Sequence, residues 1–268
     1  MSNYFSYLLI DTALIDAAHP IHTLKGKQSV KWFKTLYERS ARSVSPIVVD
    51  IEGAIRSNRV ELMMSAANLG SRNIGLSLIE SSLSLEEVAV HLRQFIYFVD
   101  QDGVEFTLRV ADCAVLLAMS QTLTAVQWSA LMSPFLRWRV FDRERELDDL
   151  PRAVTETIAQ PPLMLTKAQV AQLQCAAEPD RLLANLSAMR PTILDGWRPL
   201  DAHRVATKII EIWNESENKD HSTLLIFARA VFDSGARLLQ HTDAVEYLKE
   251  SDQAAVRRSI QQRLEKYS

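Results

Sequence analysis

The sequence predicts an α/β N-terminal lobe with a mixed sheet, followed by an all-α C-terminal lobe. In the first half, short apolar runs alternate with segments of helical spacing, and the pair Asp102-Gly103 marks a hairpin turn. In the second half, every long segment has helical spacing. A charge-rich stretch ending in Pro161-Pro162 separates the halves. We therefore expect an α/β domain over 1–141, a linker over 142–162 and a helical lobe over 163–268.

The elements of the N-terminal lobe follow from apolar runs and from the residues that bound them. Tyr7–Ile10 and the run in SPIVVDIEG predict two buried strands, with a helix between them over 29–42. A third strand is expected over 74–79. Ser84 and Glu87 have the spacing of a capping box, which predicts that a helix begins there. Strand and helix then alternate up to the hairpin.

The C-terminal lobe is expected to contain no strand. Five stretches have the apolar spacing of amphipathic helices, beginning with LTKAQVAQLQCAA and DRLLANLSAM and ending with the segment up to LEKY. Polar residues that favour helix N-termini precede several of them. The second half is therefore predicted to be a set of packed helices.

Composition limits the function classes. The 268 residues are 47% apolar and 24% charged, with a formal net charge of −3, so no basic excess indicates a nucleic-acid partner. The longest apolar runs are far shorter than the roughly 20 residues that span a bilayer, and no signal peptide is expected. Cys113 and Cys175 are expected to be buried, reduced thiols of a cytoplasmic protein. Neither a nucleic acid nor a membrane is an expected partner.

Acidic residues at strand ends are the candidates for chemistry, because no glycine-rich phosphate loop, nucleophile elbow or HExxH motif occurs. Four acids follow apolar runs: Asp11, Asp50, Glu52 and Asp112. If three converged, they could hold a divalent cation and support a metal-dependent hydrolase. Alternatively, they accept hydrogen bonds from loop amides and cap helices, with Arg109 paired to Asp112 or to another acid. We favour the structural role and expect no catalytic residue, no metal and no cofactor.

Tryptophan and arginine are the residue types enriched where proteins bind each other. Trp32, Trp128 and Trp213 lie on apolar helical faces and are predicted to be core residues. Two other places are candidates for contact with a partner protein, one in FLRWRV and one in a loop bounded by Gly and Pro. The candidate residues are Arg137, Trp138, Arg139 and Trp197.

Taken together, several segments resemble the bacterial type VI secretion effector chaperones, or adaptors, long catalogued as a domain of unknown function. The resemblance covers residues 6 to about 138. It rests on YLLIDTAL, SPIVVDIEG, SLSLEEVAVHLRQFIYFVDQDGVEFTLRVADCAVL and the helix beginning LTAVQW, in that order. It implies an α/β lobe followed by a variable helical lobe. It also implies a protein that binds a toxic effector in the cytoplasm and delivers it to the valine–glycine repeat spike protein.

The resemblance also assigns residues. Arg109 and Asp112 fall on the family's arginine and aspartate after the hairpin, and Asp50 with Glu52 on its acidic strand end. The chain departs from the pattern around the aspartate: Ala111 precedes it where the family usually has an aromatic residue, and Cys113-Ala114 replaces Pro-Arg. The acids are then structural.

The favoured hypothesis is a non-catalytic cytoplasmic adaptor that binds a cognate secreted effector through its helical lobe and helps to load it onto the spike protein. The first alternative is the metal-dependent hydrolase that uses the strand-end acids. The second is a scaffold that associates with itself through the helical lobe.

Overall fold

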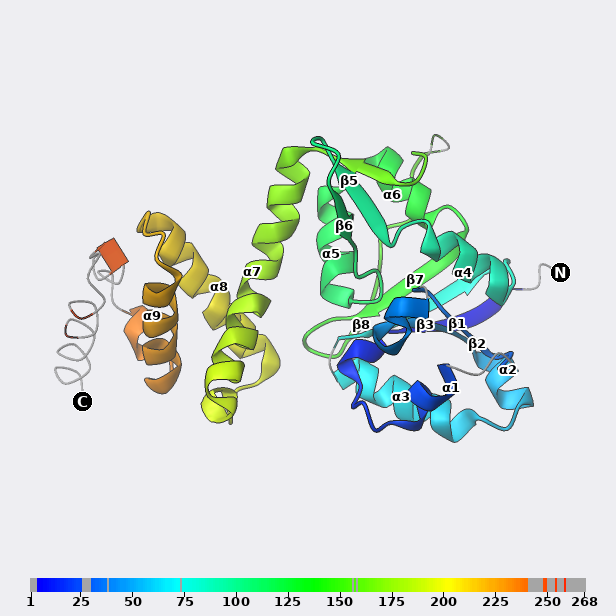
Figure 1. Cartoon of the computed structure of the whole chain (residues 1–268), viewed down its shortest axis with the longest axis horizontal. Helices are drawn as coiled ribbons and strands as arrows, with labels where there is room; N and C mark the ends of the chain where they lie inside the picture. Colours follow the sequence, from blue (N-terminus) through cyan, green and yellow to red (C-terminus); the bar gives the residue numbers. More distant parts are fainter. Residues whose placement is uncertain are drawn as a thin grey trace. The chain divides into compact units, whose positions relative to one another are not determined.

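The computed structural model describes residues 4–25, 30–37, 39–72, 74–155, 157, 159–240, 248–249, 254 and 258. The chain forms two compact units, Met1–Leu173 and Gln174–Ser268, and the boundary falls inside the long helix α7 (Lys167–Met189) (Figure 1). Strands and helices make up the first unit, and the described part of the second contains helices only. The predicted fold class is confirmed.

A six-stranded sheet forms the centre of the first unit. Its strand order is β2-β3-β1-β4-β7-β8, and every neighbouring pair is antiparallel. Ile10, at the end of β1, lies opposite both Ile47 and Leu76. The strands are β1 (Phe5–Ile10), β2 (Phe33–Thr35), β3 (Ile47–Asp50), β4 (Leu76–Ser81), β7 (Phe135–Phe141) and β8 (Leu147–Asp149).

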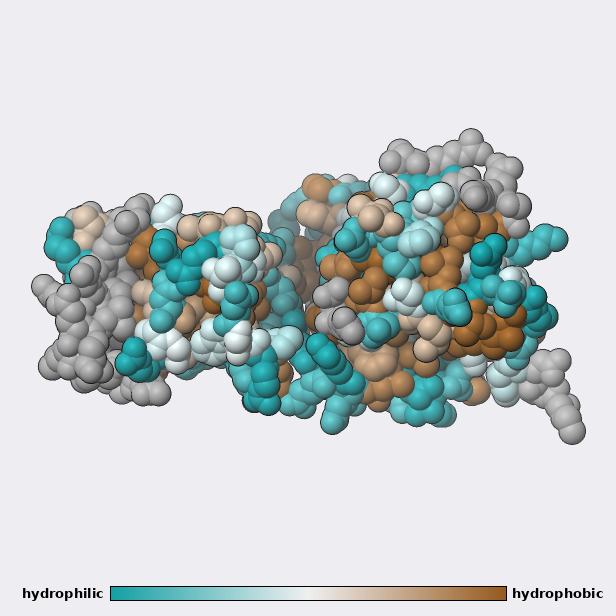
Figure 2. Space-filling model, turned by 90° about the horizontal axis from the view of Figure 1, so that it is seen from below, coloured by the Kyte–Doolittle hydropathy of each residue, from teal (hydrophilic) through white to brown (hydrophobic). Residues whose placement is uncertain are grey.

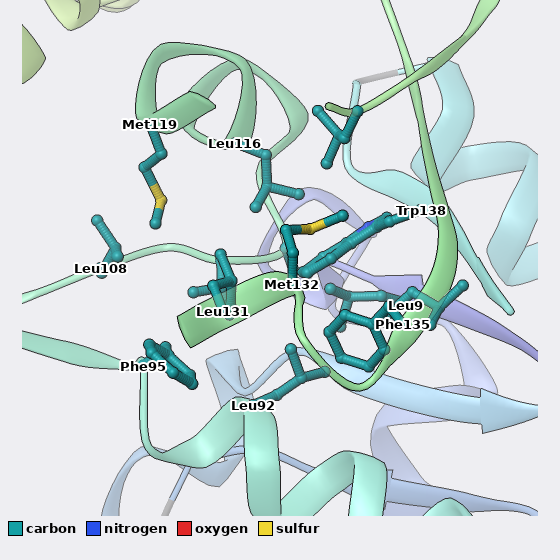
Figure 3. Close-up of a cluster of buried hydrophobic side chains, with 14 of the residues drawn as sticks. Leu9, Leu92, Phe95, Leu108, Leu116, Met119, Leu131, Met132, Phe135 and Trp138 are labelled. Carbon is teal, nitrogen blue, oxygen red and sulfur yellow. The ribbon is translucent and has the colours of Figure 1, made fainter. Parts of the chain in front are cut away.

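Both faces of this sheet are buried, because its strands carry apolar residues at successive positions. On one face, Leu9, Ile79 and Trp138 belong to a core that also includes Leu92 and Leu116 from two covering helices (Figure 3). The opposite face supplies a second core. The helices of this unit are α1 (Pro20–Lys25), α2 (Ile51–Arg56), α3 (Val60–Arg72), α4 (Leu85–Arg93), α5 (Cys113–Thr122) and α6 (Ala125–Met132), with 3-10 turns η1 (Thr12–Leu14) and η2 (Arg39–Val44).

A smaller mixed sheet packs in the same unit, with strand order β6-β5-β9. β5 (Tyr97–Asp100) and β6 (Glu105–Thr107) form the predicted hairpin, and β9 (Leu163–Leu165) runs parallel to β5. Gly103 adopts a φ of +79°, as the Asp-Gly signal predicted. The capping box of Ser84 and Glu87 is also present at the start of α4.

The second unit has its own apolar core, formed by the C-terminal part of α7 with α8 (Pro199–Glu215) and α9 (His221–Asp233). Two 3-10 turns, η3 (Pro191–Leu194) and η4 (Arg237–Gln240), accompany these helices. Ile209 and Phe227 have no exposed surface. None of the described helices combines the length and the apolar character that crossing a bilayer requires.

Several expected elements are corrected. The helix expected over 29–42 is wrong: Phe33 lies in β2 opposite Val49, so the apolar residues are buried by strand pairing instead of by a helical face. The absence of strands after residue 162 is also wrong, because Leu163 and Leu165 are buried in β9. The charge-rich stretch 142–162, which was expected to be a linker, contains β8, and β8 pairs with β7.

In the second unit, α7 is one continuous helix where two were expected, and Pro179 lies within it. The helices expected beyond residue 240 fall almost wholly outside the described residues. Cys113 is buried, but Cys175 is exposed on α7, which corrects the expectation for that residue; both are free thiols.

Candidate functional site

Arg109 connects two of the strand-end acids. One terminal nitrogen of its guanidinium lies 2.6 Å from Oδ2 of Asp11, and the other lies 3.3 Å from Oδ2 of Asp112. The side chain of Asp11 is only 3% exposed and that of Asp112 17%, whereas Arg109 is 46% exposed. Burial raises the pKa of the Asp112 carboxyl, and Arg109 opposes that effect. Arg109 therefore compensates a buried negative charge from the surface side.

Each of these two acids also caps a helix. Oδ1 of Asp11 accepts a hydrogen bond from the amide of Ala13 at the start of η1, and Oδ1 of Asp112 accepts one from Ala114 at the start of α5. Such caps satisfy amides that the helix leaves unpaired. The pairing of Arg109 with Asp112, expected from the sequence, is thus present together with a stronger contact to Asp11.

Backbone contacts hold the same region together. The amide of Asp11 donates to the carbonyl of Gly75 over 2.8 Å, and the amide of Cys113 donates to the carbonyl of Ile74 over 3.0 Å. A Cβ on Gly75 would lie 2.7 Å from Cδ1 of Leu14 and 3.1 Å from Cβ of Asp11, so a side chain there would require Leu14 to move. The end of β1, the start of β4 and the start of α5 meet here.

Lys25 is a buried base beside this cluster. Its ammonium contacts the hydroxyl of Thr12 and donates to the carbonyl of Ser43 over 2.9 Å, while the residue is 5% exposed. Burial lowers the pKa of Lys25 to about 8, and the charge of Asp11 opposes the shift. No signal in the sequence marked this residue, because the two lysines of the stretch TLKGK are typical of a solvated loop.

Asp50 and Glu52 lie at the other end of the sheet. β1 and β3 are antiparallel, and Asp50 is opposite Tyr7, four residues before Asp11, which corresponds to about 13 Å along the strand. Both acids pair with Arg56, at 3.5 and 3.2 Å. The rule that strand C-termini gather at one edge applies to parallel sheets, so it does not bring these acids to Asp11.

The four acids therefore form two separate groups. Asp11 and Asp112 share Arg109, and Asp50 and Glu52 share Arg56. Within the described residues, no three His, Cys, Asp or Glu side chains are grouped so that they could hold a metal ion. The arrangement that the hydrolase alternative requires, with three of these acids converging, does not form.

The arginines of β7 and Trp138 point in different directions, as alternation along a strand requires. Trp138 has no exposed surface; its indole nitrogen donates to the hydroxyl of Ser77 over 2.9 Å, and its ring packs edge-on against Phe135 (Figure 3). A contact between Trp138 and a partner protein is therefore corrected to a core position. Arg137 and Arg139 lie on the other side of the strand and pair with Asp149 and Glu80.

Trp197 belongs to the second unit and is half-buried. Its ring lies edge-on to Phe232, with 5.3 Å between ring centroids, so part of it packs on the helical core. Trp32, Trp128 and Trp213 are buried, as predicted.

A family model described as "Domain of unknown function (DUF4123)" matches residues 6–130. The matched segment contains both acid groups, Arg109 and Arg56, and it ends within α6, before β7 and the second unit. A search of the curated proteins and of the solved structures found no match.

Proposed function

We propose that this protein is a non-catalytic cytoplasmic adaptor, which binds a secreted effector of a type VI secretion system and helps to load it onto the valine–glycine repeat spike protein. The matched segment, 6–130, contains the sequence stretches that resemble the adaptor family, including YLLIDTAL and SPIVVDIEG. That family was long catalogued as a domain of unknown function, which agrees with the description of the matching model.

The observation that carries the proposal is the engagement of every strand-end acid. Asp11 and Asp112 each form an ion pair with Arg109 and accept a hydrogen bond from a backbone amide. Asp50 and Glu52 form ion pairs with Arg56. A general base needs a carboxylate that reaches the substrate. Here all four carboxylates contact arginines, and those of Asp11 and Asp112 also accept from amides. These contacts favour a structural role for the four acids, as expected in a protein that binds a partner without catalysing a reaction.

The distribution of exposed apolar side chains supports a role for the first unit in binding. Among the described residues, every large apolar side chain that is well exposed lies in the first unit, apart from Met189 in the second. On the face shown in Figure 2, brown side chains lie between teal ones over the sheet-containing unit. Exposed apolar surface of this kind is common where proteins associate. The helical lobe as the client-binding part stays a separate hypothesis.

The proposal is tested by capture of a client from the native cells. Tagged full-length protein should co-purify with a large toxin-like protein encoded nearby, identified by mass spectrometry, in an amount well above that found with an untagged control. Asp50→Ala combined with Glu52→Ala is the matched variant. Because the proposal gives these acids no catalytic role, the variant should capture the client in proportion to the amount that stays folded. Absence of any client with both forms would contradict the adaptor role.

Point variants are the suitable test of the helical lobe, since deleting residues 160–268 would also remove β9 and Gln169 from the first unit. Gln169 donates to the carbonyl of Thr122 and to Gln127 there. Met189→Asp in the second unit and Met64→Asp in the first form a matched pair, because both side chains are exposed. Selective loss of the client with Met189→Asp would support the helical-lobe hypothesis, and selective loss with Met64→Asp would contradict it.

A further inference from the structure

β7 and β8 separate at one end and leave a pocket between them. The amide of Leu150 donates to the carbonyl of Trp138 over 2.8 Å, which is the last ladder contact between the two chain segments. Pro151 follows and has no amide hydrogen to continue the ladder. The carbonyl of Pro151 instead accepts from the indole of Trp128, and the amide of Val154 donates to Ser129. The chain after β8 is therefore held against α6, and β7 continues paired with β4 only.

The pocket in this fork has a volume of about 420 Å³. Its apolar lining comes from Met132, Leu136, Leu150 and Trp138, of which Leu136 alone is well exposed. Leu136 lies at an irregularity in the pairing of β7 with β4, where the register shifts between Glu80 and Ser81, and its side chain is 41% exposed. A bulge of this kind redirects a side chain. An apolar residue is thus presented at the pocket instead of being buried in the sheet.

The charged side chains that line the pocket differ in whether they form an ion pair. Arg137 binds Asp149 through two nitrogens, at 2.6 and 2.7 Å, so these two charges compensate each other. Arg152 also lines the pocket and is exposed, and it forms no ion pair with any described residue. Glu80 lines the pocket as well and pairs with Arg139 over 3.5 Å. The pKa of the Asp149 carboxyl is lowered chiefly by Arg137 and to a smaller extent by Arg152. Arg152 is therefore the charged side chain of the pocket without an ion pair among the described residues, which favours an acidic ligand group beside the apolar lining.

The outer edge of β8 is free within the described part of the chain, since β8 is the last strand of its sheet. Antiparallel pairing alternates, and the contacts of Glu146 with Asp142 and of Leu150 with Trp138 fix which residues face β7. Leu147 and Asp149 are the intervening residues, so their backbone groups point outward. An extended segment can pair with such an edge through main-chain hydrogen bonds.

We propose that the fork between β7 and β8 binds an extended segment of the client protein, which pairs with the free edge of β8, places a large apolar side chain against Leu136 and an acidic side chain against Arg152. The inference rests on the proposed function only in naming the client as the source of the segment. The edge supplies affinity for any extended chain, while the apolar lining and Arg152 supply selectivity.

Synthetic peptides test the pocket without a known client. The probe is a fluorescent, end-blocked peptide of alternating Thr and Val with Leu-Thr-Asp at its centre, so that Leu and Asp lie on one face of the strand. A second peptide carries Leu-Thr-Lys instead. Fluorescence anisotropy with the full chain should show tighter binding of the Leu-Thr-Asp peptide, by about three- to ten-fold. Arg152→Glu should reverse that preference, and Leu136→Asp should weaken both peptides. Arg59→Glu, an equal charge change on an exposed residue between α2 and α3, should leave the preference unchanged.

Equal binding of the two peptides by the wild-type chain, or an unchanged preference in Arg152→Glu, would overturn the inference. Client capture separates this failure from a failure of the proposed function. If wild type and Arg152→Glu capture the same client equally, the adaptor role stands and the fork is not its binding site. If neither form captures a client, the adaptor role fails. Loss of the client with Arg152→Glu and its retention with Arg59→Glu would support both.

Discussion

The guanidinium of Arg109 lies 2.6 Å from the buried carboxylate of Asp11, which stands 98 positions earlier in the chain. This contact joins the end of β1 to the segment between the hairpin and α5. Asp11 is almost inaccessible, whereas Arg109 is half-exposed. Among the described residues, Arg109 is the only cation in hydrogen-bond contact with the Asp11 carboxylate. We therefore expect this pair to contribute to the free energy of unfolding.

Arg109→Met should lower the free energy of unfolding by about 2–4 kcal/mol, because it leaves Asp11 buried without its compensating charge. Asp11→Asn should cost less, because it removes the buried charge; its single amide oxygen then replaces only one of the two acceptors that Asp11 offers to Ala13 and Arg109. The double variant should be less destabilised than the sum of the two, which indicates direct coupling. Urea denaturation of the four forms measures these values.

Arg59→Met is the matched control, because Arg59 is exposed and makes no ion pair with a described residue. Its free energy of unfolding should stay within about 0.5 kcal/mol of wild type. Additive effects of Arg109→Met and Asp11→Asn would contradict a direct contact.

Lys25 should make stability depend on pH. Burial lowers its pKa to about 8 in the folded chain, against 10.5 for an ordinary lysine. Below pH 8 the side chain is protonated in both states and the burial penalty is fully present. Between about pH 8 and 10.5 the unfolded chain binds more protons, so the free energy of unfolding rises with pH. Wild type should therefore gain about 1–2 kcal/mol relative to Lys25→Met between pH 7 and 9.5.

Urea denaturation of wild type and Lys25→Met at both pH values gives this difference, and other titrating groups cancel in it. Because the variant also loses the hydrogen bonds to Thr12 and Ser43, the change with pH is the diagnostic quantity. A difference that does not vary with pH would show that Lys25 titrates as an exposed lysine.

Local sequence signals predicted the parts of the fold that short segments determine. The hairpin followed from Asp102-Gly103, and the start of α4 from Ser84 and Glu87, because in each case the residues that carry the signal make the contacts. The helix expected over 29–42 failed because Phe33 is buried by pairing with Val49, a contact that no local spacing reveals. Short apolar runs fit a helix and a strand equally well.

The candidate site shows the same limit at longer range. Asp11, Asp50 and Asp112 were identified from their positions after apolar runs, but the direction of the neighbouring strands decides which of them meet. In the antiparallel sheet, Asp50 lies opposite Tyr7 and away from Asp11. Trp138 was misplaced for a related reason: alternation puts it on the opposite side of β7 from Arg137 and Arg139, and it packs in a core with residues such as Leu92 of α4, which no local spacing reveals.

The two cysteines should differ strongly in reactivity. Cys175 is exposed, whereas Cys113 is fully buried, and burial raises the pKa of its thiol to about 12. A chromogenic disulfide reagent at pH 8 should therefore modify one thiol per native chain quickly and the second only after denaturant is added. Cys175→Ser should abolish the fast phase. A fast phase that persists in Cys175→Ser would contradict the buried position of Cys113.

Trp138 should contribute to stability and not to binding. Its indole nitrogen donates to the hydroxyl of Ser77, which is also buried. Trp138→Phe therefore leaves that hydroxyl without its partner and creates a space in the core. We expect a loss of about 1–3 kcal/mol in the free energy of unfolding by urea denaturation. Ser77→Ala combined with Trp138→Phe should recover part of that loss, because it removes the unsatisfied hydroxyl. Client capture per folded molecule should be unchanged in Trp138→Phe, and a selective loss of the client would instead place Trp138 at the binding surface.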